Sequence, residues 1–80
     1  MKNKVTQEQA LDLGKILRLN WQRYDFKEFR VGLVVEQEHL KTIRSYARPH
    51  VNEMLAVAMT VVDHLDENPK YYTLLTKAGL

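Results

Sequence analysis

Apolar side chains recur along most of the chain at steps of three and four residues, the spacing of a helix with one buried face. The first such stretch opens with Thr6 and Gln9, a capping-box pair in which each side chain can bond the backbone N–H of the other residue. A helix is therefore predicted from this pair to about Leu17. Residues 18–25 break the period, so we expect a connector there, with Trp21 filling part of the core.

A second capping pattern, Asp25 with Glu28, starts the longest predicted helix, which runs to about Tyr46. Pro49 ends this helix, because proline disfavours helical geometry at the residue before it. The helix carries an apolar stripe made of Phe26, Phe29, Leu33, Leu40, Ile43 and Ala47. Glu36 stands within that stripe, so the pattern predicts a buried carboxylate.

A third helix is predicted from about Val51 to Glu67, and its apolar residues on nearly every side favour a central position. Asn68 and Pro69 suit the N-cap and the first position of a last helix. Gly79 suits the C-terminal cap of that helix. Four helices with short connections predict an all-α bundle.

The composition indicates one small domain with ordinary globular character. Eighty residues are enough for a single helical domain, which we expect to span residues 1–80 with residues 1–5 flexible. Cysteine is absent, which excludes disulfides, thiolate chemistry and cysteine-bound zinc. No signal peptide is visible, and no apolar run approaches the roughly 20 residues that span a bilayer. We therefore expect a cytoplasmic protein without membrane association.

Patterns typical of catalysis are weak. The sequence has no Ser-His-Asp spacing and no glycine-rich phosphate loop, and its only serine, Ser45, has no activating pattern nearby. A bundle of this size also leaves little room for a substrate pocket. The sequence thus predicts a protein that is not an enzyme and has no cofactor.

Three stretches carry a resemblance that covers almost the whole chain: GKILRLNW (14–21), FRVGLVVEQEHL (29–40) and DHLDENPKYY (63–72). They are similar to motifs of a group of small, uncharacterised helical domains of bacteria and phages. The resemblance implies no activity. It implies that the motif positions are Glu36, Glu38, His39, His64, Glu67, Pro69, Tyr71 and Tyr72. The chain departs from the motifs at three positions, where Gln37 replaces a leucine, Leu40 a glycine and Lys70 an aspartate.

The acidic and histidine residues form two sequence patterns that suggest a metal site. Glu36 and His39 are three residues apart, and His64 and Glu67 repeat the pair in reverse, as in di-iron carboxylate bundles. In an antiparallel hairpin of the two long helices, Glu36 and His64 would be offset by roughly 6 Å along the axis, but His39 and Glu67 by roughly 15 Å. One chain with this hairpin therefore cannot gather all four around one ion, and such a site would require a dimer or a different topology.

A structural ion pair explains the same residues without a ligand. A buried glutamate needs a partner, and the small axial offset makes His64 the expected partner of Glu36. Arg30, or the hydroxyl of Tyr71 or Tyr72, could complete the network. This structural interpretation is the one we favour for Glu36 and His64.

Binding of a macromolecular partner is the function that fits these observations best. We expect a larger protein as the partner, with a phage-type inhibitor or adaptor as one form of this role. Tyrosine and arginine are enriched in binding hot spots. The candidate contact residues are Arg18, Arg23, Tyr24, Lys27, Arg30, Tyr46 and Tyr72.

Nucleic acid is an alternative partner. Residues 15–30 form a basic face with Lys15, Arg18, Arg23, Lys27 and Arg30, which could contact phosphates. Against this, acidic residues are interspersed and the net charge of the chain, +2, is modest for a DNA-binding domain. The sequence does not determine an oligomeric state.

Overall fold

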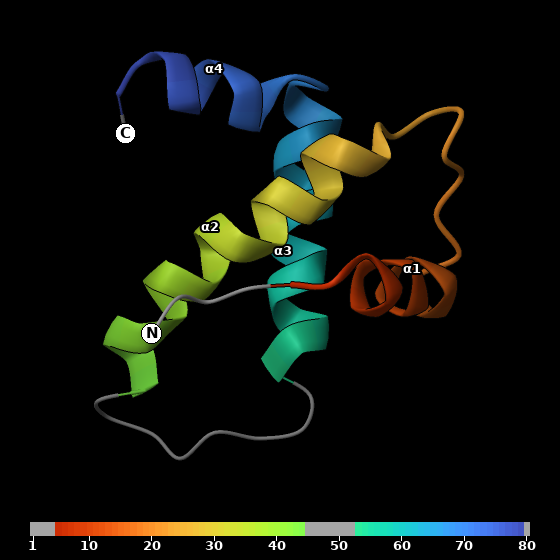
Figure 1. The fold of residues 1–80 in the computed structure, drawn as a ribbon, viewed down its shortest axis with the longest axis horizontal. Helices are drawn as coiled ribbons and strands as arrows, with labels where there is room; N and C mark the ends of the chain where they lie inside the picture. Colours follow the sequence, from red (N-terminus) through yellow and green to blue (C-terminus); the bar gives the residue numbers. More distant parts are fainter. Residues whose placement is uncertain (1–4, 45–52, 80) are drawn as a thin grey trace.

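Four α-helices make up the part of the chain that the structure describes (Figure 1). The computed structural model describes residues 5–44 and 53–79, the side chains of residues 39–44 excepted. In chain order the helices are α1 (Gln7–Ile16), α2 (Phe26–Arg44), α3 (Glu53–Glu67) and α4 (Tyr71–Lys77). These ranges contain no strand, so the predicted all-α fold with four helices is confirmed. The ends predicted at Tyr46, Pro49 and Val51 lie outside the described residues.

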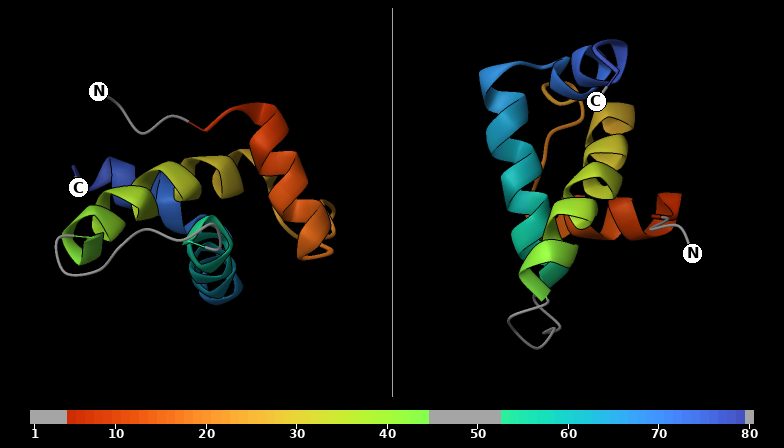
Figure 2. Two further views of the ribbon diagram at one scale, coloured as in Figure 1. Left: turned by 90° about the horizontal axis from the view of Figure 1, so that it is seen from below. Right: turned by 90° about the vertical axis from the view of Figure 1, so that its left-hand side faces the viewer.

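The two longest helices, α2 and α3, run in opposite directions and cross obliquely (Figures 1 and 2). The first helix, α1, contacts both of them. The last helix, α4, also contacts both and lies across the end where α2 begins and α3 ends (Figure 2). Each long helix is thus covered by parts of the other three.

The core draws apolar side chains from all four helices. Its buried members are Val5, Ala10, Phe29, Leu33, Val57, Ala58, Val61, Leu65 and Tyr72. Val5 belongs to the segment expected to be flexible, yet it is buried. The third helix contacts the other three as predicted, but one of its faces points outward, where Met59 is 54% exposed. Apolar composition on nearly every side therefore did not mean burial on every side.

Glycine permits close packing at two places in this core. A Cβ atom built on Gly14 of α1 would lie 2.4 Å from the Trp21 ring, so only glycine lets this ring approach the helix. The Trp21 ring packs against Phe26 and Phe29, with ring centroids 5.0 and 5.5 Å apart, in the core-filling position predicted for it. A Cβ atom on Gly32 of α2 would likewise lie 2.5 Å from the Tyr72 ring.

The capping box at the start of α1 is confirmed. The backbone N–H of Gln9 donates to Thr6 Oγ1 at 3.0 Å, and that of Thr6 donates to Gln9 Oε1 at 2.9 Å. At the other end of α1, Arg18 adopts a left-handed conformation with φ of 57°. Arg18 N–H bonds the Lys15 carbonyl and Leu19 N–H bonds that of Gly14, the hydrogen bonds of a Schellman motif.

The start of α4 differs from its prediction. Asn68 does not act as the N-cap, because the helix begins at Tyr71 and the preceding residue is Lys70. Asn68 instead forms the turn, since its side chain accepts from Lys70 N–H at 3.0 Å and its carbonyl from Tyr71 N–H at 2.9 Å. Gly79 follows the end of α4 with φ of 81°, the conformation expected of a glycine cap.

None of the helices within residues 5–44 and 53–79 combines the length and the apolar composition needed to cross a membrane.

Candidate functional site

A buried polar cluster joins α2, α3 and α4. Glu36 is only 7% exposed, and its Oε2 atom accepts a hydrogen bond from the Tyr72 hydroxyl at 2.9 Å. The same oxygen lies 3.1 Å from His64 Nδ1, which in turn lies 3.0 Å from the Tyr72 hydroxyl. The structure therefore brings Glu36 and His64 together and adds Tyr72, one of the partners considered from the sequence.

Tyr72 is held inside the protein by packing as well as by hydrogen bonds. Its side chain is fully buried and its ring packs against Gly32. Burial, reinforced by the hydrogen bond to Glu36, raises the pKa of Tyr72 well above its usual range, so the phenol remains a donor. This corrects the prediction that Tyr72 contacts a partner, because the side chain does not reach the surface.

The other motif residues do not assemble a metal site around this cluster. Tyr71 stacks on the His64 ring, with centroids 4.5 Å apart. Glu67 is exposed at the end of α3, and the side chain of His39 lies outside the described residues. Among the side chains that the structure describes, no three of His, Asp or Glu converge in a way that could hold an ion.

Sequence patterns did not reveal the role of Glu28. Its backbone N–H bonds Asp25 Oδ1 at 3.1 Å, as the capping pattern predicts, but its buried carboxylate reaches across to α4. There Oε1 accepts from Tyr72 N–H at 3.0 Å and from Thr73 N–H at 3.3 Å, and Oε2 accepts from the Thr73 hydroxyl. Glu28 thus caps a helix other than its own, which explains why Asn68 is not needed there.

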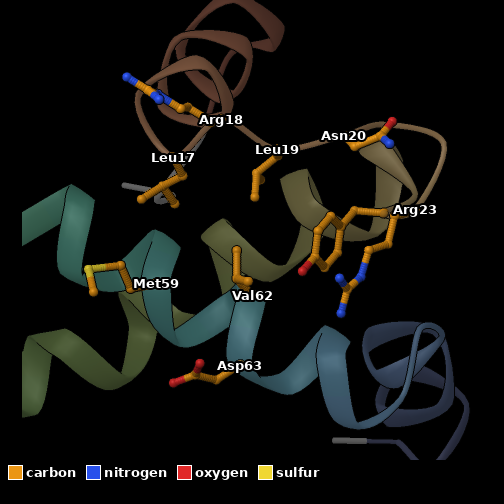
Figure 3. Close-up of a pocket in the computed structure, with 9 residues that line it drawn as sticks. Leu17, Arg18, Leu19, Asn20, Arg23, Met59, Val62 and Asp63 are labelled. Carbon is orange, nitrogen blue, oxygen red and sulfur yellow. The ribbon is translucent and has the colours of Figure 1, made fainter.

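On another face, an open groove of about 460 Å³ lies between the end of α1, the connector and α3 (Figure 3). Leu17 and Leu19 face Met59 and Val62 of α3 across it (Figure 3). Arg23 lies at the end near Asn20, and the Arg18 side chain extends beyond Leu17, away from α3 (Figure 3). The full lining consists of Leu17, Arg18, Leu19, Asn20, Arg23, Tyr24, Met59, Val62 and Asp63. We refer to this feature as the α1–α3 groove.

Arg23 and Tyr24 are braced against α3 by a single carboxylate. Asp66 Oδ1 accepts from Arg23 at 3.0 Å and from the Tyr24 hydroxyl at 2.7 Å. The Arg23 guanidinium also lies 5.2 Å from the centroid of the Tyr24 ring, within range of a cation–π interaction. The hydrogen bond to Asp66 raises the pKa of Tyr24. One end of the groove is therefore pre-organised.

The predicted contact residues divide among different places. Arg18, Arg23 and Tyr24 line the α1–α3 groove, whereas Lys27 lines a separate hollow between α2 and α4. Arg30 donates through Nε to the Val5 carbonyl at 2.9 Å. Tyr46 lies outside the described residues. The basic residues of 15–30 thus do not all line one hollow.

Sequence reasoning missed the apolar half of the groove. Met59 and Val62 belong to a helix whose composition suggested an interior position, so nothing in the local pattern marked them as accessible. Leu17 was expected at the end of the first helix, and it is only half-buried. The exposure of these residues depends on where α1 crosses α3.

Comparison with models of protein families identifies the family of this chain. Residues 7–79 match the model of the family described as "Protein of unknown function (DUF5661)", and the chain belongs to that family. No curated protein and no solved structure matches it.

Proposed function

We propose that this member of a family of unknown function is a non-enzymatic module that binds a partner protein through the α1–α3 groove. The observation that carries the proposal is the exposed apolar surface of the groove. Met59 is 54% exposed beside Leu17, Leu19 and Val62, and Ile16 at the same end of α1 is 62% exposed. Such apolar surface, bordered by polar groups, is typical of interaction sites.

The side-chain types in the groove also suit a protein partner. Arg, Tyr and Met are enriched at the centres of protein interfaces, and all three occur in the lining. Arg23 and Tyr24 are held in place by Asp66, so little conformational entropy is lost when they contact a partner. A volume of about 460 Å³ would receive a few side chains of a docked segment.

The buried acids support a binding role over a catalytic one. The buried polar residues of the described chain are Glu28 and Glu36. Glu28 caps α4, and Glu36 accepts the hydrogen bond of Tyr72 beside His64. These carboxylates stabilise the helix packing, which accounts for their burial without any reaction.

The resemblance to bacterial and phage domains supports a larger host or viral protein as the partner. In that setting the module would inhibit the partner or connect it to another protein. Both roles need a stable surface that recognises one protein, and the braced groove would supply that surface.

Exchange of one exposed residue tests this proposal. The wild-type chain, Met59→Lys and Leu74→Lys are each immobilised and exposed, after nuclease treatment, to a lysate of the organism that encodes the chain. Leu74 on α4 is 50% exposed and does not line the groove, so Leu74→Lys is a matched control. The captured protein is then produced by itself and its Kd measured by titration calorimetry.

We expect Leu74→Lys to bind like the wild type and Met59→Lys to bind at least about tenfold more weakly, because a lysine cation would be desolvated in the interface. Equal binding by Met59→Lys would exclude the groove. Capture that nuclease or moderate salt abolishes would favour nucleic acid instead.

A further inference from the structure

The end of α1 presents an arginine in a backbone conformation that normally suits glycine. Arg18 has φ of 57°, and it is the residue after Leu17, the C-cap of α1. For a residue with a Cβ atom this left-handed conformation is unfavourable, because the Cβ atom comes too close to the following carbonyl oxygen. Gly occupies the equivalent position in most Schellman motifs.

Contacts of the Arg18 side chain with the described residues do not offset this unfavourable backbone conformation. Within the described residues, the guanidinium group of Arg18 makes no hydrogen bond and no ion pair. Arg18 lines the edge of the α1–α3 groove; its side chain is exposed and extends beyond Leu17, away from α3 (Figure 3). Strained residues of this kind cluster at binding sites, where the position of the side chain matters more than local stability.

Charge distinguishes the two walls of the groove. The lining residues between 17 and 24, which form one wall, include Arg18 and Arg23 and no acidic residue. Arg23 is already paired with Asp66 of α3. On the α3 wall Asp63 is exposed, and its carboxylate forms no ion pair with the described residues. Of the two arginines that line this wall, Arg18 is therefore the one without an ion pair to the described residues.

Resting on the function proposed above, we infer that the groove recognises a protein segment in which an Asp or Glu lies next to an apolar side chain. The apolar side chain would pack between Leu17 and Met59. The carboxylate would accept hydrogen bonds from Arg18, since guanidinium and carboxylate groups match in a bidentate geometry. The apolar contact provides affinity, and Arg18 selects the acidic neighbour.

A random-peptide display library of twelve-residue segments tests this inference without knowledge of the natural partner. The library is selected in parallel on the wild-type chain, Arg18→Glu and Lys77→Glu, a matched charge reversal at an exposed residue of α4 that does not line the groove. We expect the wild type to enrich peptides with Asp or Glu beside Leu, Ile, Phe or Met. Arg18→Glu should lose these peptides and enrich basic ones, while Lys77→Glu should retain the acidic preference.

Binding of the enriched peptides to Met59→Lys distinguishes a failure of the proposed function from a failure of the inference about Arg18. Peptides that bind Met59→Lys as well as they bind the wild type would show that the groove is not the site, and the proposed function would fail with the inference. Peptides that require Met59 and yet are neutral or basic would overturn the inference about Arg18 and leave the proposed function intact. The same holds for peptides that require Met59 but bind Arg18→Glu as tightly as they bind the wild type. Absence of enrichment on the wild type, or a wild-type dimer that Met59→Lys dissociates, would also overturn it.

Arg18→Gly provides a second measurement that a purely structural arginine would not satisfy. Glycine adopts this φ without a Cβ clash, so we expect the melting temperature of the variant to be unchanged or higher. Its affinity for the acidic peptides should fall roughly tenfold, as for the loss of one charge-assisted contact. A lower melting temperature with unchanged affinity would show that Arg18 serves the fold and would contradict the inference.

Discussion

Tyr72 is held at both ends by carboxylates of the same helix. Its backbone N–H donates to Glu28 and its hydroxyl donates to Glu36, two helical turns further along α2. Glu36 and Tyr72 also contact His64, so one residue of α4 is tied to both long helices. Polar groups buried in this way stabilise one arrangement of the helices, because a displaced carboxylate would lose its partners.

Replacement of Glu36 tests whether this cluster serves the fold. Glu36→Gln keeps an acceptor for Tyr72 but removes the charge beside His64, so we expect a loss of about 1–2 kcal/mol in unfolding free energy. For a domain of this size the melting temperature should fall by roughly 4–8 °C per kcal/mol. The shift should be the same with and without a chelator.

An exposed glutamate of α1 supplies the control for that measurement, since Glu8→Gln should change the melting temperature little. An unchanged melting temperature in Glu36→Gln would contradict the interpretation that Glu36 and His64 stabilise the fold. A shift that appears without a chelator and disappears when one is added would instead support the metal interpretation of this helix.

Gln37 is a site where the chain is less stable than its packing allows. Its Nε2 atom is buried and has no hydrogen-bond partner among the described residues. We expect Gln37→Leu to raise the unfolding free energy by about 1 kcal/mol, because the unsatisfied donor is replaced by an apolar group of similar size. Chemical denaturation would measure the change, with the exposed Gln7→Leu as a control. A destabilised Gln37→Leu would mean that the amide is satisfied in solution.

At the scale of elements, α4 depends on its surroundings more than any other helix. It has seven residues, too few for a helix to be stable by itself in water. The side chain of its N-cap residue, Lys70, forms no capping hydrogen bond with the first turn. The cap comes instead from Glu28, which lies 44 residues before Tyr72 in the sequence. The attachment of α4 to α2 and the formation of α4 are thus one event.

Glu28→Ala should therefore detach α4 before it unfolds the rest. Three donors at the start of α4 would lose their acceptor, and we expect a destabilisation of about 2–3 kcal/mol. Hydrogen exchange should show faster exchange of the α4 amides, with protection in α2 and α3 largely kept. Glu28→Gln retains one acceptor oxygen, so its stability and its α4 protection should lie between those of the wild type and Glu28→Ala. Unchanged α4 protection in Glu28→Ala would contradict the capping role.

At the scale of the whole molecule, two helices and the connector form the groove, and no single helix contains it. Leu17 and Leu19 come from the end of α1 and the connector, and Met59 and Val62 from α3. The Schellman motif after α1 turns the chain so that Leu17 and Leu19 stand opposite α3 (Figure 3). The Trp21 ring packs against Gly14 and so holds the connector between α1 and α2 in place.

Much of the architecture follows from local pattern. Apolar spacing and capping residues predicted the four helices, the Thr6–Gln9 capping box and the role of Gly79, because these depend on contacts within one or two turns. The approach of Glu36 to His64 also followed from sequence, since an antiparallel hairpin places residues at similar heights along the two axes. Both kinds of prediction need only the helix geometry and the direction of the chain.

Contacts between helices that are distant in sequence had to come from the tertiary structure. The burial of Tyr72, the capping of α4 by Glu28 and the exposure of Met59 all depend on the angles at which the helices cross. A helical pattern defines which side chains share a face, but it does not define which part of that face a neighbouring helix covers. The sequence by itself thus determined the helices and their polar pair, and the packing of α1 and α4 on the hairpin decided which residues became core, cap or groove.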